Sequence, residues 1–139
     1  MKIKNIWKEI EKPLEMHEDN RGKIVDVFYQ QDIEHVAVID SNKGALRGNH
    51  YHKETTQHML MTKGSMEYWY KPVDSQEPPN HIIVKQGDLV STEPLEVHAL
   101  KMLEKENQFI VFSSGLRGGR DYESDTFRVD SIFPTEHSE

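Results

Sequence analysis

The stretch GALRGNHYHKETTQHMLMTKG, residues 44–64, decides the fold predicted for this chain. Side chains alternate between the two faces of a β-strand, so we expect His50 and His52 on one face, together with Gly48 and Leu46. Burial of two imidazoles on one strand face is costly unless each ring has a hydrogen-bond partner. The sequence therefore predicts that this histidine pair forms the centre of a site.

Two further residues are candidates to complete that site. The apolar run after the histidines places Met59 and Met61 on one face, and a hairpin that buries them would bring Gln57 toward the histidines. His98 follows a turn over residues 93–96 and would close a site of three histidines and one amide. Neutral imidazole suits transition metals, so the expected cofactor is one divalent metal (Zn, Fe, Ni or Mn) or none. The alternative role for Gln57 is that of a structural amide.

The remainder of the chain is typical of short strands separated by turns. Runs rich in β-branched and aromatic residues predict strands at residues 23–29, 33–40, 46–52, 57–62, 65–70, 81–85 and 108–113. Turn residues at 20–22, 41–44, 62–64 and 86–88 separate these runs as hairpins. Helical spacing occurs only in the first dozen residues, before Pro13. The pattern predicts an all-β sandwich or barrel.

Length and composition favour one globular domain over residues 1–139, with a polar, flexible tail from about residue 134. The net charge of −7 argues against nucleic acid as a partner, and no apolar run is long enough to span a membrane. The absence of cysteine excludes thiolate chemistry. The N-terminus lacks an apolar signal stretch, so we expect a cytoplasmic protein, and edge strands favour a homodimer.

The spacing of the glycines and histidines resembles the first motif of the cupin superfamily. In this sequence the motif runs from Gly44 through His50 and His52 to Gln57 and Gly64, with Gln57 at the position where cupins usually have Glu. The second cupin motif is matched by Gly87, Pro94 and His98, with one residue fewer between the proline and the histidine. This resemblance implies a single-domain cupin, a jelly-roll β-barrel.

Three short sequence motifs resemble those of nucleotide-sugar 3,4-ketoisomerases and 3,5-epimerases. These motifs are the Arg-Gly-x-His segment that ends at His50, the turn Asp19-Asn20-Arg21-Gly22, and the acidic segment at residues 121–126. The resemblance implies that His50 is a general base or metal ligand and that Arg47 and Arg21 hold a diphosphate. His52, where the epimerases tend to have Gln, shifts the likeness toward the ketoisomerases.

The chemistry implied by this resemblance requires proton transfer at a carbon next to a ketone. Neutral His50 or His52 would accept that proton near pH 7, and a metal or a tyrosine hydroxyl would stabilise the enolate. Tyr70 is therefore a catalytic candidate and Tyr68 a substrate-binding one, with strand packing as the alternative role of both. The remaining histidines are interpreted as surface or structural: His17, His35, His58, His81 and His137.

The predicted function is that of an isomerase or epimerase acting on a nucleotide-linked keto-deoxysugar in deoxysugar or surface-polysaccharide biosynthesis. Two alternatives stay open from other classes. The first is a metal-dependent cupin oxygenase, in which three histidines and an amide hold a redox metal. The second is a non-catalytic sugar-binding cupin, which the amide of Gln57 keeps open.

Overall fold

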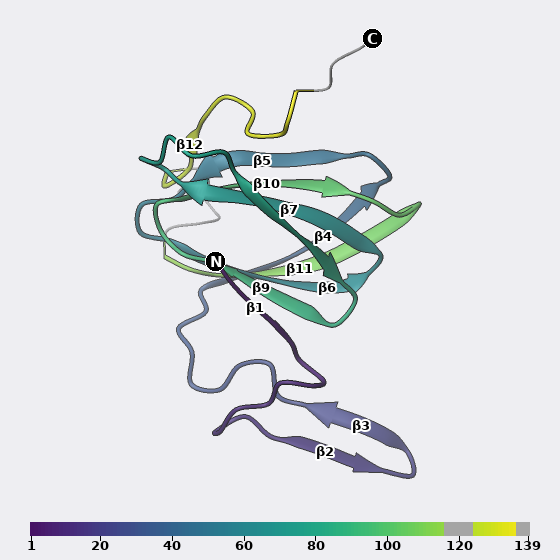
Figure 1. Cartoon of the computed structure of the whole chain (residues 1–139). Coiled ribbons are helices and arrows are strands. Elements are labelled where there is room, and N and C mark those ends of the chain that lie inside the picture. Colours follow the sequence, from purple (N-terminus) through teal and green to yellow (C-terminus); the bar gives the residue numbers. More distant parts are fainter. Residues whose placement is uncertain (116–123, 136–139) are drawn as a thin grey trace.

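A computed structural model describes residues 1–115 and 124–135, and these residues form strands and connecting loops without an α-helix (Figure 1). No helix able to cross a membrane is therefore present in the described part of the chain. The strands in chain order are β1 (Lys2–Asn5), β2 (Met16–Asp19), β3 (Gly22–Val25), β4 (His35–Asn42), β5 (Leu46–Tyr51), β6 (Thr56–Lys63), β7 (Ser65–Pro72), β8 (Asn80–Lys85), β9 (Asp88–Thr92), β10 (Glu96–Met102), β11 (Glu106–Ser114) and β12 (Phe127–Arg128).

Two five-stranded sheets make up the body of the protein. Sheet I has the order β1-β9-β6-β11-β4 and sheet II the order β12-β5-β10-β7-β8, with antiparallel pairing throughout. From β4 to β11, all but one of the connections between consecutive strands pass from one sheet to the other. The predicted all-β jelly roll is confirmed. Among the described strands no ladder joins the sheets into a closed barrel.

The predicted turns mostly join the sheets instead of closing hairpins. Only the turn at residues 20–22 connects two strands that pair with each other, β2 and β3. The turns at 41–44, 62–64 and 86–88 each carry the chain from one sheet to the other. The strand pair 46–52 and 57–62 is likewise no hairpin, because β5 belongs to sheet II and β6 to sheet I. Gln57 therefore faces the histidines across the sandwich and not along a shared ladder.

Helical structure expected in the first dozen residues is absent, and that prediction is wrong. Residues Lys2–Asn5 instead pair with β9 at the edge of sheet I. The next residue, Ile6, is buried with Leu60 and Leu89 on the outer face of the same sheet. Pairing with an open edge and burial of Ile6 thus outweigh the local periodicity.

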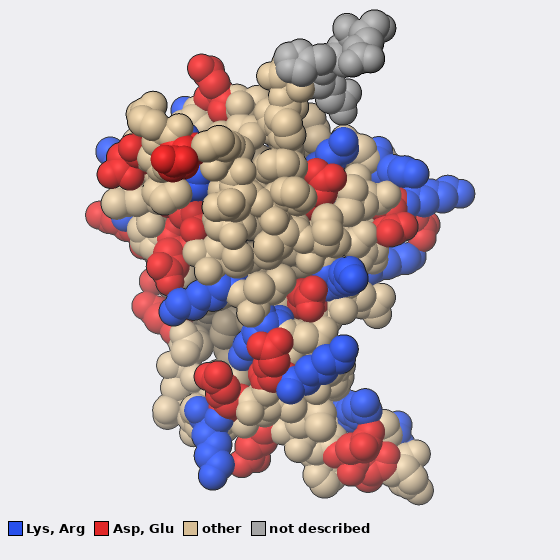
Figure 2. All heavy atoms as spheres, viewed as in Figure 1, with Lys and Arg blue, Asp and Glu red and all other residues tan. Residues whose placement is uncertain are grey.

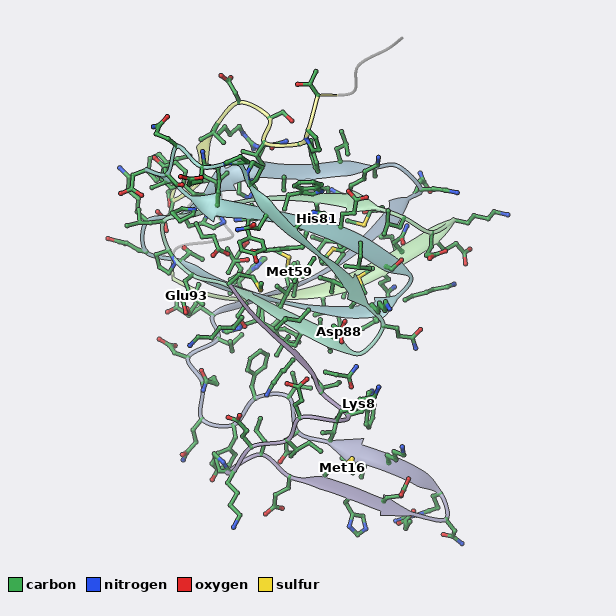
Figure 3. The ribbon with its side chains drawn as sticks, viewed as in Figure 1. Lys8, Met16, Met59, His81, Asp88 and Glu93 are labelled. Atoms are coloured by element: carbon green, nitrogen blue, oxygen red, sulfur yellow. The ribbon has the colours of Figure 1, made fainter. Side chains whose placement is uncertain are left out.

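The apolar core lies between the sheets. Its buried members come from both inner faces: Met59, Met61, Met66, Tyr68, Val84, Val90, Leu100, Met102, Phe109 and Val111. Figure 3 shows Met59 between the two layers, whereas Met16 lies on the hairpin β2–β3 that projects away from them. The core fills one part of the interior, and polar side chains occupy the rest.

Charged side chains of both signs are intermixed on the face shown in Figure 2, over the sheets and over the projecting hairpin. Over the whole sequence, 24 acidic and 17 basic residues give the net charge of −7. The predicted tail from about residue 134 lies partly outside the described residues, which end at 135.

Candidate functional site

Polar residues are buried together at one end of the interior, beyond the apolar core. Six of them are at most 2% exposed, although burial of polar groups is costly unless they are hydrogen-bonded: His52, Thr55, Gln57, Thr92, His98 and Ser113. Such a concentration is the first structural sign of a site.

A row of polar side chains crosses the inner face of sheet II. Residues opposite each other in an antiparallel ladder share a face. The register pairs Arg128 with His50, His50 with His98, and His98 with Tyr70. One row therefore brings together residues from β12, β5, β10 and β7 that lie far apart in the sequence.

A second row crosses the inner face of sheet I. The register pairs His35 with Ser113, Ser113 with Gln57, and Gln57 with Thr92. The next residues inward on these strands, such as Met59 and Val111, belong to the apolar core. The two polar rows thus form facing walls at the same end of the sandwich.

The strand alternation predicted for β5 is interrupted by a bulge, and this corrects one expectation. Gly48 and Asn49 have positive φ angles of 89° and 59°, and the β5–β10 register shifts between His98 and Ala99. As a result Arg47, and not Leu46, lies opposite buried Leu100. Leu46 is 59% exposed.

The bulge has a chemical consequence. Arg47 and His50 are three residues apart and would lie on opposite faces of a regular strand. In the structure both line the same cavity. The extra residue therefore brings a cation to the side of the histidines.

Three imidazoles converge at the centre of the site. The candidate ligand nitrogens of His50, His52 and His98 all lie within 4.8 Å of one another. The ring centroids of His50 and His98 are 4.6 Å apart, and those of His50 and His52 are 5.0 Å apart. The structure thus brings together the three histidines predicted from the sequence.

Backbone carbonyls fix the tautomers of two of these rings. His52 Nδ1 lies 2.7 Å from the carbonyl oxygen of Asp125, and His98 Nδ1 lies 3.2 Å from that of Glu96. A carbonyl oxygen only accepts, so in both neutral rings Nδ1 carries the hydrogen and Nε2 carries the lone pair. Nε2 of His52 is buried and has no hydrogen-bond partner among the described residues.

Asp125 holds the loop that follows the histidine strand. Its carboxylate accepts backbone N–H groups of Lys53, Glu54 and Thr55 at 2.8–2.9 Å and the Thr55 hydroxyl at 2.8 Å. Burial acts to raise the pKa of Asp125, but these hydrogen bonds outweigh burial and lower it. The side chain orders the loop while the backbone oxygen orients His52.

The donor set fits a divalent transition metal. Neutral imidazole nitrogens with a second-shell carbonyl on the other nitrogen are the usual protein ligands of such ions. Two nitrogens bound to one ion at about 2.1 Å in a tetrahedral site are about 3.4 Å apart, so nitrogens within 4.8 Å of one another would move closer together to share an ion. Gln57, the predicted fourth ligand, lines the cavity beside His50 and His98.

A cavity of about 370 Å³ opens beside the histidines, a size suited to a small molecule. Among the described residues, its polar lining includes His50, His98 and Gln57, and its cationic lining includes Arg47 and Arg128. The remaining lining comes largely from core residues such as Met59 and Leu100. Histidines, an amide and two guanidinium groups thus share one hollow.

Arg47 is held in place by β4. Its Nε donates to Ser41 Oγ at 2.8 Å and its Nη2 donates to the Asp40 carbonyl at 3.2 Å. Neither bond uses Nη1, so the guanidinium can still pair with an anion.

Tyr68, predicted to bind substrate, is fully buried in the core. Its hydroxyl interacts with the Thr92 hydroxyl and donates to Glu96 Oε1 at 3.1 Å. Burial and the nearby Glu96 carboxylate raise its pKa well above the usual value. Tyr70, predicted to be catalytic, is half-buried and lies opposite His98 in the ladder.

Arg21 lies apart from the histidines. It is at the tip of the hairpin β2–β3, which projects from the sandwich, and its side chain is 84% exposed (Figure 1). The guanidinium pairs with Asp19 at 2.6 Å. The Asp-x-Arg-Gly motif is thus explained locally as a turn closed by an ion pair.

Sequence reasoning missed Arg128, Asp125 and Ser113. The sequence pattern that could have indicated Asp125 is the acidic segment at residues 121–126. Residues 121–123 of this segment lie outside the described part of the chain. Arg128 and Ser113 enter the site only through strand register, with β5 and β6 respectively. A pattern along the sequence does not indicate which residues lie opposite each other on neighbouring strands.

Comparison with known families gives one match. A family model described as "Polysaccharide biosynthesis C-terminal domain" matches residues 17–117, which is more than half of the chain. No curated protein matches the chain significantly.

Several solved structures have the same fold. The capsular polysaccharide assembling protein CapF of Staphylococcus aureus aligns with a TM-score of 0.63 and 21% identity over 87% of this chain, which spans only 34% of that protein. A 3,4-ketoisomerase from Helicobacter canadensis aligns with a TM-score of 0.71 and 20% identity over 92% of this chain and 90% of that one.

A third similar structure is the dTDP-4-dehydrorhamnose 3,5-epimerase of Sulfolobus tokodaii, with a TM-score of 0.67 and 19% identity over 86% of this chain and 76% of that one. At identities this low, the structural similarity establishes the fold alone. The resemblance to sugar-biosynthetic cupins, first seen in short sequence motifs, is confirmed at that level.

Proposed function

This chain belongs to the polysaccharide biosynthesis C-terminal domain family, and we propose that it is an isomerase or epimerase acting on a nucleotide-linked keto-deoxysugar. One observation carries the proposal: a single cavity is lined by His50, His98, Arg47 and Arg128. Proton-transferring and anion-binding groups within one hollow are what a nucleotide sugar requires.

His50 is the proposed general base. It lines the cavity, whereas His52 is 2% exposed and is held by the Asp125 carbonyl. A neutral imidazole in this position would take the proton from the carbon next to the ketone and return it at the neighbouring carbon or on the other face. His52, beside His50, and Tyr70, opposite His98, are the other proposed participants.

Arg47 and Arg128 are proposed to bind the diphosphate. A guanidinium forms paired hydrogen bonds with phosphate oxygens, which a lysine ammonium does not. The bonds from Arg47 to Ser41 and Asp40 support this role because they hold its side chain at the cavity before substrate arrives.

A divalent metal is proposed to bind to His52 and His98. His50, the third histidine of the cluster, is a ligand only if another group acts as the base, because a metal-bound nitrogen cannot accept a proton. When bound, such an ion polarises a carbonyl oxygen as a Lewis acid. The protein contributes the orientation of two rings through the carbonyls of Asp125 and Glu96.

The direct test is solvent exchange. The full chain is incubated in deuterium oxide with dTDP-4-keto-6-deoxyglucose and, separately, with its UDP counterpart, and NMR records deuterium at the carbons beside the ketone. We expect exchange with at least one sugar, lost in His50→Gln and retained in His81→Gln, whose histidine is exposed on β8. Absence of exchange in the parent protein with every such sugar would overturn the proposal.

The three-histidine cluster also favours a second candidate, a metal-dependent oxygenase. Metal analysis and oxygen consumption separate the two. A redox metal near one per chain together with oxygen uptake supports the oxygenase. A protein that binds nucleotide diphosphates and consumes no oxygen supports the sugar reaction.

A further inference from the structure

The side chain of Gln57 is buried without a partner for its amide nitrogen. The residue is 2% exposed, and Nε2 has no hydrogen-bond partner among the described residues. Buried polar groups in proteins are nearly always paired, so an orphaned donor indicates a ligand or an ordered water. Because Gln57 lines the cavity with His50 and His98, its donors are available to a molecule bound there.

The neighbours of Gln57 in its row do not engage this amide. The hydroxyl of Thr92 interacts with that of Tyr68 across the sandwich. On the other side Ser113 is fully buried, and its Oγ likewise lacks a partner in the described part of the chain. Two adjacent donor groups are therefore directed into the interior without being satisfied by the protein.

A metal ion does not account for this arrangement by itself. An amide binds a metal through its oxygen, so the two N–H groups of Gln57 would stay unpaired. A carboxylate at this position would be the stronger ligand. An amide has the advantage where negative charge develops, because it donates hydrogen bonds and does not repel that charge.

We propose that Gln57 donates a hydrogen bond to the ketone oxygen of the substrate and to the enolate that forms from it. This inference rests on the proposed function. His50 takes the proton from the adjacent carbon, the electrons of that C–H bond form the carbon–carbon double bond, and the carbonyl electrons move onto oxygen. Gln57 stabilises that oxygen from the wall opposite the histidines. Return of the proton to the same carbon on its other face gives the epimer. In a ketoisomerisation the enolate oxygen takes up a proton, the hydroxyl on the neighbouring carbon gives one up, and the proton returns to the former carbonyl carbon. Neither route needs an oxidant or reductant.

The experiment compares Gln57→Leu, which removes donor and oxygen, with Gln57→Glu, which keeps an oxygen ligand. Gln86→Glu, at an exposed turn, is the matched control for the added charge. Each protein is measured for thermal stability, metal content, affinity for dTDP by calorimetry, and deuterium exchange into the 4-keto sugar nucleotide.

We expect Gln57→Leu to lose about 100-fold in exchange rate, the usual effect of removing one oxyanion donor. Its metal content and its affinity for dTDP, which has no ketone, should match those of the parent. Exchange within threefold of the parent overturns the proposal. So does a Gln57→Leu protein that loses metal while Gln57→Glu keeps both metal and exchange, because Gln57 is then a metal ligand.

A second measurement separates this inference from the proposed function. The parent should bind the 4-keto sugar nucleotide more tightly than dTDP, and Gln57→Leu should lose that difference. If Gln57→Leu loses the difference but the parent shows no exchange, the proposed reaction fails and the contact to the ketone stands. If the parent exchanges protons and Gln57→Leu keeps the difference in affinity, the reaction stands and the contact fails.

Discussion

A β-carbon added to Gly48 would lie 2.7 Å from the carbonyl oxygen of His98. The close approach of these two strands places His50 opposite His98. In Gly48→Ala the strands must separate, and the φ of 89° is unfavourable for alanine. We expect a loss of about 2–4 kcal/mol in the free energy of unfolding, measured by urea titration.

Gly44→Ala is the matched control for that substitution. Gly44 has a similar φ of 82°, but an added β-carbon would meet nothing within 4 Å. Its cost should be confined to the backbone term of about 1 kcal/mol. Equal destabilisation by the two variants would show that the close approach of Gly48 to the carbonyl of His98 does not contribute to the loss in the free energy of unfolding.

The fold was predictable because its main signals are local. Alternating apolar residues and turn glycines indicated seven strands, and each has a counterpart in the structure, β3 to β8 and β11. The strand β10 is not among these runs because its buried faces on both sides leave no alternation to mark its extent. β12 was missed because two residues pair with β5 only through tertiary context.

The site was predictable in part. Spacing alone pointed to His50, His52 and His98, and the structure brings them within one cluster. The side on which Arg47 lies depends on a bulge, and bulges follow from strand contacts that a linear pattern does not contain. Arg128 belongs to the cavity for the same kind of reason, since it is opposite His50 only through register.

Removal of the Asp125 carboxylate should loosen the loop after β5. Asp125→Ala leaves the backbone N–H groups of residues 53–55 without their acceptor, and that of Thr55 is buried. We expect a loss of about 2–4 kcal/mol in the free energy of unfolding. Hydrogen exchange should show faster amide exchange confined to residues 53–55. Unchanged protection there would contradict the role assigned to this side chain.

Acid should destabilise the protein through the same residue. The folded state lowers the pKa of Asp125, so its contribution to stability is complete above the unfolded value of about 3.9 and is lost as the pH falls through the lower folded value. Unfolding free energies measured from pH 6 to pH 3 should fall toward acid. The slope should be smaller in Asp125→Asn, and an unchanged slope would refute the assignment.

The two cavity arginines should control nucleotide affinity. Loss of a charge-assisted hydrogen bond costs about 1.5–3 kcal/mol, so Arg128→Ala and Arg47→Ala should each weaken binding of dTDP at least about tenfold. Arg47→Lys should restore little, because an ammonium lacks the paired donors. Arg21→Ala serves as control, since Arg21 is exposed on the distant hairpin. Calorimetry at two salt concentrations measures the affinity of each variant for dTDP and how far that affinity depends on charge.

The two tyrosines should separate into a structural and a functional residue. In Tyr68→Phe the partners Thr92 and Glu96 lose a buried hydroxyl, which should cost about 1–3 kcal/mol of stability with exchange activity largely kept. Tyr70→Phe, opposite His98, should keep stability and lower the exchange rate. The reverse pattern would assign the reaction to Tyr68.

Metal binding should stabilise the folded chain through the histidine cluster. An ion that binds only the folded state adds about 2.7 kcal/mol at a concentration of 100 times its Kd, which is a rise of about 5–10 °C in Tm. We expect this rise on adding zinc after chelator treatment, and its loss in His52→Ala and His98→Ala, which each remove one nitrogen of the cluster. His81→Ala, an exposed histidine stacked on Trp69, should respond like the parent. A rise that persists in His52→Ala and His98→Ala would place the ion elsewhere, and its absence from the parent would leave proton transfer to the imidazoles alone.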